Sequence, residues 1–189
     1  MAIIIGMSGA TGAIYAVRLL EMLKQAGVET HFVATKSAAL CLSLETPYRM
    51  ADVQALATYT HSPGNVAASI SSGSFRTLGM VVAPCSVKTL SGIANCYEDN
   101  LLLRAAGVTL KERRRLVLLF RETPLHPGHL RLMSEAARLG SVLFPPVPAF
   151  YTQPTTLAEV VDQTCGRVLD QFGIDVGVDR WEGVQGRVP

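Results

Sequence analysis

Short apolar runs alternate with helical patterns along most of the chain. We interpret five runs as buried strands: residues 2–6, 30–35, 80–83, 116–121 and 141–145. Most are rich in Val, Ile and Leu with little alternation, which is typical of parallel strands covered on both faces. The pattern therefore predicts an α/β fold, a three-layer doubly wound parallel sheet in a single domain spanning residues 1–189.

Helical spacing of apolar residues is clearest in three segments. Residues 12–26 predict a helix with a wide apolar face, a short helix begins at Lys36, and residues 157–172 predict a closing helix. Residues 51–79 give no clear periodicity, and their small-residue patch AASISSGS is either a loop or the start of a helix.

The composition is apolar for a soluble domain. Hydrophobic residues make up 49% of the 189 residues and charged ones 17%, where about 25% charged is usual. Membrane insertion is excluded because no apolar run approaches the roughly 20 residues that a span needs. Either other subunits or a ligand cover much of the surface, or this is an ordinary α/β domain with buried strands.

Charge and cysteine content narrow the class further. The net charge is +2, and the densest charge run, residues 111–115, is better interpreted as a solvated helix end than as a nucleic-acid patch. Four cysteines show no CxxC pair and no disulfide-framework spacing, which indicates reduced thiols. The first apolar run is too short for a signal peptide, so we expect a cytoplasmic protein without nucleic-acid or membrane partners.

The first predicted strand runs into the sequence GMSGATG, residues 6–12. Glycines let a ligand approach the backbone, and a helix that starts here presents free N–H groups to an anion. Ser8 and Thr11 add hydroxyl groups. The spacing GxxGxxG differs from the dinucleotide fingerprint GxGxxG, and no Walker lysine follows. The motif indicates either a phosphate or cofactor site or a tight turn that packs helix on strand.

Other predicted strands also end in polar residues. Thr35 stands at the end of the second strand, Ser86 comes shortly after the run 80–83, and Arg121 ends a later strand. A serine in this position can cap a helix, and an arginine can clamp a phosphate. Because carboxyl ends of parallel strands meet at one edge of the sheet, these residues predict a ligand cleft there.

Longer blocks of sequence point to a family. SGATGAIYAVRLL, SLET, ISSGSFRTLGMVVAPCSVKTLSGIA, LLLRAAGVTLKERRRLVLLFRETPLHPGHLRLM and PPVPAFY together resemble the UbiX-like flavin prenyltransferases, formerly described as aromatic acid decarboxylases or their B subunits. The resemblance covers nearly the whole chain. It implies a Rossmann-like or flavodoxin-like flavoprotein fold and a homododecamer built from trimers.

The same resemblance implies a reaction. Reduced FMN is a substrate, dimethylallyl phosphate is the co-substrate, and no metal is needed. The product is prenylated FMN, the cofactor of UbiD-like decarboxylases, which implies a functional link to such a partner. Whether that partner serves ubiquinone synthesis or the degradation of phenolic acids stays open.

Site residues follow from the resemblance by matching motifs. Glu45 corresponds to the catalytic glutamate, and Thr11 would lie near the reactive flavin nitrogen. Tyr151 and Arg167, together with Arg121, correspond to ligands of dimethylallyl phosphate. The residues matched to FMN binding are Gly9, Ala10, Thr11, Thr35, Ser86, Val87, Lys88, Thr89 and Arg121.

Tyr151 and Arg167 lie sixteen positions apart, so no local pairing joins them. Only a folded site, including one assembled between subunits, brings them together. We therefore expect the C-terminal helix and tail, about residues 156–189, to help form the site at a subunit interface.

Several residues have plainer interpretations. Without the resemblance, Glu45 is an exposed carboxylate at a helix end. His126 and His129 have a spacing that suits a metal, but no further ligand completes a set, so capping or packing is favoured. Cys85 is either a nucleophile or a small buried residue beside the flavin.

The chain departs from the family pattern in two places near the phosphate site. Many relatives carry a glutamate where this chain has Arg138, and some carry a lysine within the segment 125–129 that is missing here. The phosphate site is therefore expected to depend more on Arg121 and Arg167.

Two alternative functions remain at this point. One is an FMN-dependent decarboxylase of peptidyl cysteines, and the other is a non-catalytic flavin-carrying subunit of an aromatic acid decarboxylase. The Phe-Tyr pair at positions 150–151, together with Arg167, favours prenyl transfer over both alternatives. Direct decarboxylation of aromatic acids by this chain alone is the weakest interpretation.

Overall fold

The computed structural model describes residues 2–183; the end of the predicted interface segment, residues 184–189, lies outside them. Six parallel strands form one sheet in the order β3-β2-β1-β4-β5-β6. The strands are β1 (Ala2–Met7), β2 (Thr30–Ala34), β3 (Tyr59–His61), β4 (Thr77–Cys85), β5 (Arg115–Phe120) and β6 (Val142–Leu143). The predicted parallel sheet is confirmed.

Strand burial explains the apolar runs. Every residue of β1 is buried, because helices cover both faces of the sheet. Ile4 of β1 is paired with His31 of β2 on one side and with Met80 of β4 on the other. β4 is longer than the predicted run 80–83, since it is paired along both of its sides.

The last strand is shorter than predicted. β6 contains Val142–Leu143 rather than residues 141–145, and it pairs with β5 alone at the edge of the sheet. Pro145 and Pro146 follow it, and proline has no N–H to donate to a strand ladder.

The connection order creates a crevice. From β1 the chain builds outward through β2 and β3, then returns to place β4 on the other side of β1. The loops after β1 and β4 therefore lead away in opposite directions. Ligands of doubly wound sheets bind at such a switch point, beyond the carboxyl ends of the strands.

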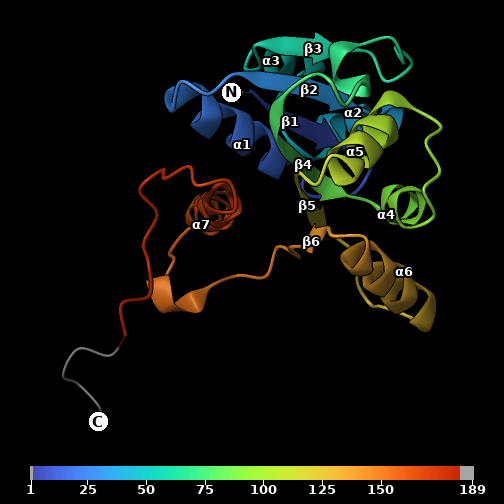
Figure 1. The fold of residues 1–189 in the computed structure, drawn as a ribbon. Helices are drawn as coiled ribbons and strands as arrows, with labels where there is room; N and C mark the ends of the chain where they lie inside the picture. Colours follow the sequence, from blue (N-terminus) through green and yellow to red (C-terminus); the bar gives the residue numbers. More distant parts are fainter. Residues whose placement is uncertain (1, 184–189) are drawn as a thin grey trace.

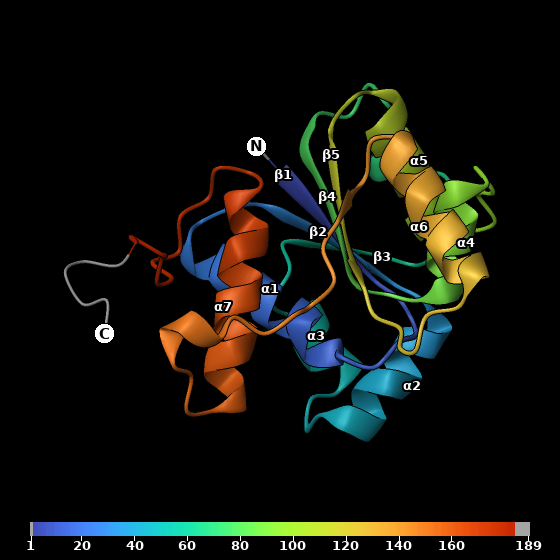
Figure 2. The same cartoon turned by 90° about the horizontal axis from the view of Figure 1, so that it is seen from below.

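Seven α-helices within residues 2–183 complete the layers. The helices α1 (Ala13–Gln25), α2 (Lys36–Glu45), α3 (Met50–Gln54) and α7 (Leu157–Asp170) share one buried cluster with the sheet. The helices α4 (Val87–Ala94), α5 (Leu101–Lys111) and α6 (Pro127–Arg138) share the cluster on the opposite face (Figures 1 and 2). Two short 3-10 helices, η1 (Ser69–Ser71) and η2 (Phe150–Thr152), lie in the connections.

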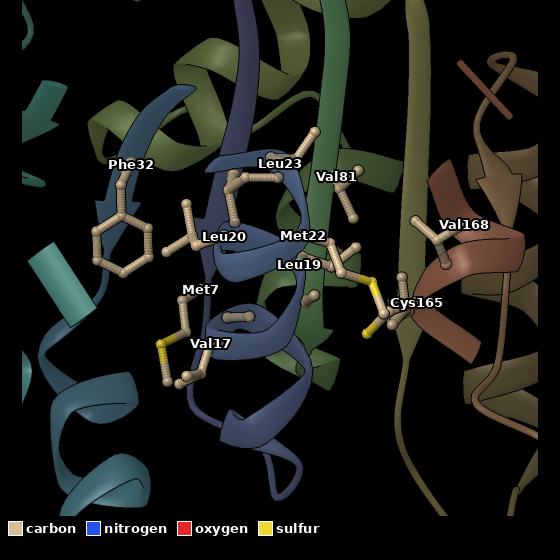
Figure 3. Close-up of a cluster of buried hydrophobic side chains, with 14 of the residues drawn as sticks. Met7, Val17, Leu19, Leu20, Met22, Leu23, Phe32, Val81, Cys165 and Val168 are labelled. Atoms are coloured by element: carbon tan, nitrogen blue, oxygen red, sulfur yellow. The ribbon is translucent and has the colours of Figure 1, made fainter. Parts of the chain in front are cut away.

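The core beside α1 shows how the last helix is held. Leu20 and Met22 of α1 and Cys165 and Val168 of α7 belong to one buried cluster (Figure 3). On the same pair of helices, Arg18 donates to both carboxylate oxygens of Asp162, at 2.6 and 3.0 Å. Apolar packing and this bidentate ion pair together fix α7 against α1.

One open region is now resolved and one sequence interpretation needs correction. Residues 51–79, which gave no clear pattern, contain most of α3, all of β3 and η1, and the start of β4. The charge run 111–115 is more than a solvated helix end, because Arg114 donates to the carbonyl oxygens of Gly73 and Phe75 at 2.7 and 2.6 Å. No helix within residues 2–183 has the length and apolarity to cross a membrane.

Candidate active site

A cleft of about 850 Å³ opens at the carboxyl ends of the strands. This volume is in the usual range for a small-molecule site. All the residues matched to FMN binding line it together: Gly9, Ala10, Thr11, Thr35, Ser86, Val87, Lys88, Thr89 and Arg121. The cleft also includes residues that the sequence analysis did not assign to it: Pro63, Gly64, Asp99, Asn100, Leu103 and Glu122.

Three helices begin at this cleft. Thr35 caps α2 by accepting from the N–H of Ala38 at 3.2 Å, and Ser86 caps α4 by accepting from the N–H of Thr89 at 3.3 Å. Asn100 caps α5. Helix N-termini carry partial positive charge, so the cleft favours a phosphate. Asn100 was missed, although an Asn just before the apolar run LLL is a helix-start signal.

The loops after β1 and β2 are in direct contact. A Cβ added to Gly9 would lie 2.3 Å from the Cβ of Ser37, closer than any real contact. Glycine is therefore required by the close approach of the two loops, in addition to any ligand. Lys36 lines the cleft beside them and adds a positive charge.

Ser8 connects the two loops at the switch point. Its side chain is buried, its Oγ donates to the carbonyl oxygen of Pro84 at 2.9 Å, and it accepts from the N–H of Ser86 at 2.8 Å. The sequence predicts that this hydroxyl is a hydrogen-bonding group for a ligand. The structure shows instead that it joins the loop after β1 to the loop after β4.

Glu45 caps a helix other than its own. It is the last residue of α2, and its Oε2 accepts from the N–H groups of Gly12 and Ala13 at 2.7 and 3.1 Å, at the start of α1. The α1 N-cap residue is Gly12, which has no side chain to do this. The carboxylate is thus held in place at a helix N-terminus.

A second hollow, of about 820 Å³, adjoins the cleft. Glu45 lines it, and Thr11 and Arg121 line both the hollow and the cleft. Most other lining residues are apolar or small, among them Ile14, Pro146, Leu157, Ala158, Val160 and Val161. A carboxylate, a hydroxyl and a guanidinium therefore meet an apolar space beside the cleft.

Tyr151 and Arg167 are brought together, as predicted, in a third hollow of about 500 Å³. Within one chain this hollow shares no lining residue with the cleft. Arg167 donates to Asp170 at 2.7 Å, which leaves the rest of its guanidinium available. Arg180 also pairs with Asp170, and the two arginines, Arg180 chiefly, hold the pKa of that carboxyl below its usual value.

Comparison with known proteins gives the family. The chain matches the Flavoprotein family over residues 1–164. It is 59% identical to flavin prenyltransferase UbiX of Escherichia coli (strain K12), over 96% of this chain and 98% of that protein. The chain belongs to the UbiX flavin prenyltransferase family.

Two solved structures of UbiX-like proteins have the same fold. One is AnUbiX (PadA1) in complex with FMN and dimethylallyl pyrophosphate, with 49% identity, a TM-score of 0.96, and coverage of 97% of this chain and 98% of that one. The other is a dodecameric FMN-dependent UbiX-like decarboxylase from Escherichia coli O157:H7, with 51% identity, a TM-score of 0.94, and coverage of 97% and 100%.

Three further residues singled out in the sequence are His126, His129 and Cys85. His126 accepts from the N–H of Gly128 at 3.0 Å, and His129 accepts from the N–H of His126 at 3.4 Å, so the two histidines cap α6, as favoured. Cys85 is buried, which raises the pKa of its thiol, so a nucleophilic role is disfavoured.

Arg138, where many UbiX relatives carry a glutamate, lies in the last turn of α6 and pairs with Glu135 at 3.5 Å. Its contacts here are those of an exposed i,i+3 ion pair. Within residues 2–183, no group of three or more His, Cys, Asp or Glu side chains is arranged to hold a metal ion.

Proposed function

We propose that this protein is a flavin prenyltransferase, which joins the dimethylallyl group of dimethylallyl phosphate to reduced FMN and releases prenylated FMN. One observation carries the proposal: a cleft with three helix N-termini at the sheet switch point, adjoined by a hollow that Glu45 lines, in a chain 59% identical to a flavin prenyltransferase. Reduced FMN supplies the ring nitrogen and aromatic carbon that form the new bonds.

In this proposal the cleft holds the flavin. The N–H groups at the starts of α2, α4 and α5, together with Lys36 and Lys88, favour the FMN phosphate. Gly9 and Ala10 give the ring system close access to the backbone. Ser8 keeps the loops after β1 and β4 at a fixed separation, so the cleft is formed before the flavin enters.

Arg121, Tyr151 and Arg167 act on the phosphate of dimethylallyl phosphate. Two guanidinium groups and a phenol stabilise the negative charge that grows on the phosphate as its bond to the prenyl carbon breaks. The hollow beside Thr11 has a mostly apolar or small lining, which suits the prenyl group. The hydroxyl of Thr11 would form a hydrogen bond near the reactive nitrogen of the flavin.

Glu45 is the proposed base. Closing the new ring bonds an aromatic flavin carbon to the prenyl group. In that step the prenyl double bond gains a proton and the flavin carbon loses one, which restores the aromatic ring. A carboxylate at the border of the cleft can accept that proton, directly or through the released phosphate. Its hydrogen bonds to Gly12 and Ala13 hold it in position.

We further propose that the site is completed between subunits of a homododecamer built from trimers. Tyr151 and Arg167 line a hollow separate from the cleft of their own chain. Large apolar side chains are also exposed on and near α7 and η2, namely Leu157, Phe150 and Val147. The described part of the C-terminal segment, up to residue 183, would then contribute to a neighbour's cleft. Light scattering of the purified protein tests the assembly.

The proposed product implies a partner protein, and the cysteines suit one cellular compartment. Prenylated FMN would be delivered to a UbiD-like decarboxylase. The four free cysteines suit the cytoplasm, where thiols stay reduced.

The decisive experiment is an anaerobic incubation of the purified protein with FMN, a reductant and dimethylallyl phosphate, followed by mass spectrometry of the released flavin. A flavin heavier by one prenyl group is the expected result. Unmodified flavin that stays tightly bound would reject the transferase and favour a carrier or a peptidyl-cysteine decarboxylase.

A further inference from the structure

Gln163 is a buried polar residue of α7 that contacts two other segments. The residue is only 7% exposed. Its Nε2 donates to the phenol oxygen of Tyr151 at 3.0 Å and to the backbone carbonyl oxygen of Asp179 at 2.8 Å. After α7 the chain turns back and passes beside η2, so that one amide holds both segments (Figure 1).

The orientation of this amide is set by its partners. The carbonyl oxygen of Asp179 can only accept, so the NH2 group of Gln163 must face it. The same nitrogen has one further hydrogen, which is donated to Tyr151. The amide oxygen Oε1 is fully buried and has no partner among the described residues, so the side chain is held through its NH2 group alone.

This arrangement fixes the role of the phenol oxygen. Tyr151 accepts from Gln163, so its own O–H hydrogen is not used in that bond and remains available for donation. Trp181 packs its ring edge-to-face against the Tyr151 ring, with centroids 5.7 Å apart at 74°. The phenol is therefore restrained both at its ring and at its oxygen.

The available hydrogen lies in a cationic setting. Tyr151, Gln163 and Arg167 line the same hollow, and Arg167 is anchored there by Asp170. A phosphate oxygen that binds Arg167 needs further donors, because an anion in a partly buried site is stabilised by several hydrogen bonds.

We propose that Gln163 is a positioning residue, which orients Tyr151 so that the phenol donates its hydrogen to the phosphate of dimethylallyl phosphate beside Arg167. This inference rests on the proposed prenyl transfer. It assigns to Gln163 no contact with the substrate.

A double-mutant cycle tests the inference. The variants are Gln163→Leu, Tyr151→Phe and the pair, and the readout is the dissociation constant of dimethylallyl phosphate, measured by calorimetry on the complex with oxidised FMN. Each single variant is expected to weaken binding about tenfold or more, the effect of losing a hydrogen bond to a charged group. The pair should be no weaker than Tyr151→Phe alone, because both changes remove the same donation.

A second variant separates positioning from packing. In Gln163→Glu the ionised carboxylate accepts the phenol hydrogen, so binding should weaken at least as much as in Gln163→Leu, although the side-chain volume is kept. Thr109→Val is the matched control, because it removes a buried hydroxyl of α5 that donates to the Ala105 carbonyl at 2.7 Å, on the other face of the sheet. FMN affinity should stay unchanged in all five variants.

The outcomes are distinct. If wild-type protein neither binds dimethylallyl phosphate nor makes a heavier flavin, the proposed function fails. If wild-type protein does both but the two single effects multiply in the pair, or Gln163→Glu binds like wild type, only the role of Gln163 is overturned. If Gln163→Leu does not fold, the cycle is run with Gln163→Glu.

Discussion

The carboxylate of Glu45 accepts a hydrogen bond from the backbone N–H of Gly12 at 2.7 Å, across 33 positions of sequence. The end of α2 is thereby joined to the start of α1 at the border of the cleft. Glu45 is exposed at the end of its helix, as the sequence alone suggests, but its hydrogen bonds to Gly12 and Ala13 hold the carboxylate in one position, which acid–base chemistry at a defined place requires.

Glu45→Gln should separate catalysis from binding. The amide oxygen can still accept from Gly12, so the start of α1 and the FMN content should change little. Product formation should slow by about 100-fold or more, the usual contribution of a general base. The measurement is the initial rate of prenylated FMN formation together with the bound flavin per protomer. Full turnover would remove Glu45 from the mechanism.

Arg167→Ala should weaken the phosphate site alone. Loss of a charged donor is expected to raise the KM for dimethylallyl phosphate by about 10- to 100-fold, with FMN content unchanged. Arg49→Ala is the matched control, since Arg49 also pairs with an aspartate three positions later, at Asp52. A normal KM in Arg167→Ala would show that the phosphate binds elsewhere.

Gly9→Ala should open the cleft. The added Cβ would lie 2.3 Å from Ser37, so the loops after β1 and β2 must separate. We expect a loss of about 1–3 kcal/mol in the free energy of unfolding, as for overpacked sites, and a sharp loss of FMN affinity. In Gly64→Ala, also at the cleft, the new methyl meets nothing within 4 Å. Urea unfolding and flavin titration of both variants check this, and equal behaviour of the two would contradict it.

A histidine pair at the edge of the sheet should make stability depend on pH. Nδ1 of His31 and Nε2 of His61 lie 2.9 Å apart, a hydrogen bond that needs one of the two nitrogens without a proton. Burial lowers the pKa of His31, although Glu29 opposes the shift, and burial together with the charge of His31 lowers the pKa of His61. The unfolded chain therefore binds more protons than the folded one below about pH 6.5.

The expected sign follows from that difference. Stability is greatest above pH 6.5 and falls as the pH drops through the unfolded pKa toward the lower folded values. Melting temperatures at pH 7.5 and pH 5.5 measure the loss, and His61→Gln should reduce it relative to wild type. An unchanged pH dependence in His61→Gln would show that other groups carry the effect.

Much of this protein can be derived from its sequence. Continuous apolar runs such as IIIG are possible only where both faces of a strand are covered, so the parallel sheet and its layers follow from local pattern. The polar ends of the strands mark the cleft, because parallel strands place their carboxyl ends at one edge. The residues matched to FMN binding all line that cleft, whereas Tyr151 and Arg167 line a separate hollow of the same chain.

Other features depended on contacts between distant segments. The hydroxyl of Ser8 was predicted to contact a ligand. It instead hydrogen-bonds to the backbone of Pro84 and Ser86, which lie more than 75 positions away. The strand β6 was predicted too long. Its length is limited by its position at the edge of the sheet and by the two prolines that follow it. The helix-capping role of Glu45 and the orientation of Tyr151 by Gln163 likewise have no local sequence signal.

The sequence by itself determined that its longest apolar runs are buried strands of a parallel sheet and which polar groups stand near their ends, because hydrophobic period and turn chemistry act over a few neighbouring residues. The tertiary structure decided which of those groups face one another and which hydrogens they have left to donate. A hydrogen bond joins atoms about 3 Å apart, however far apart their residues lie along the chain. The partners are therefore fixed only when the sheet and its helices have packed.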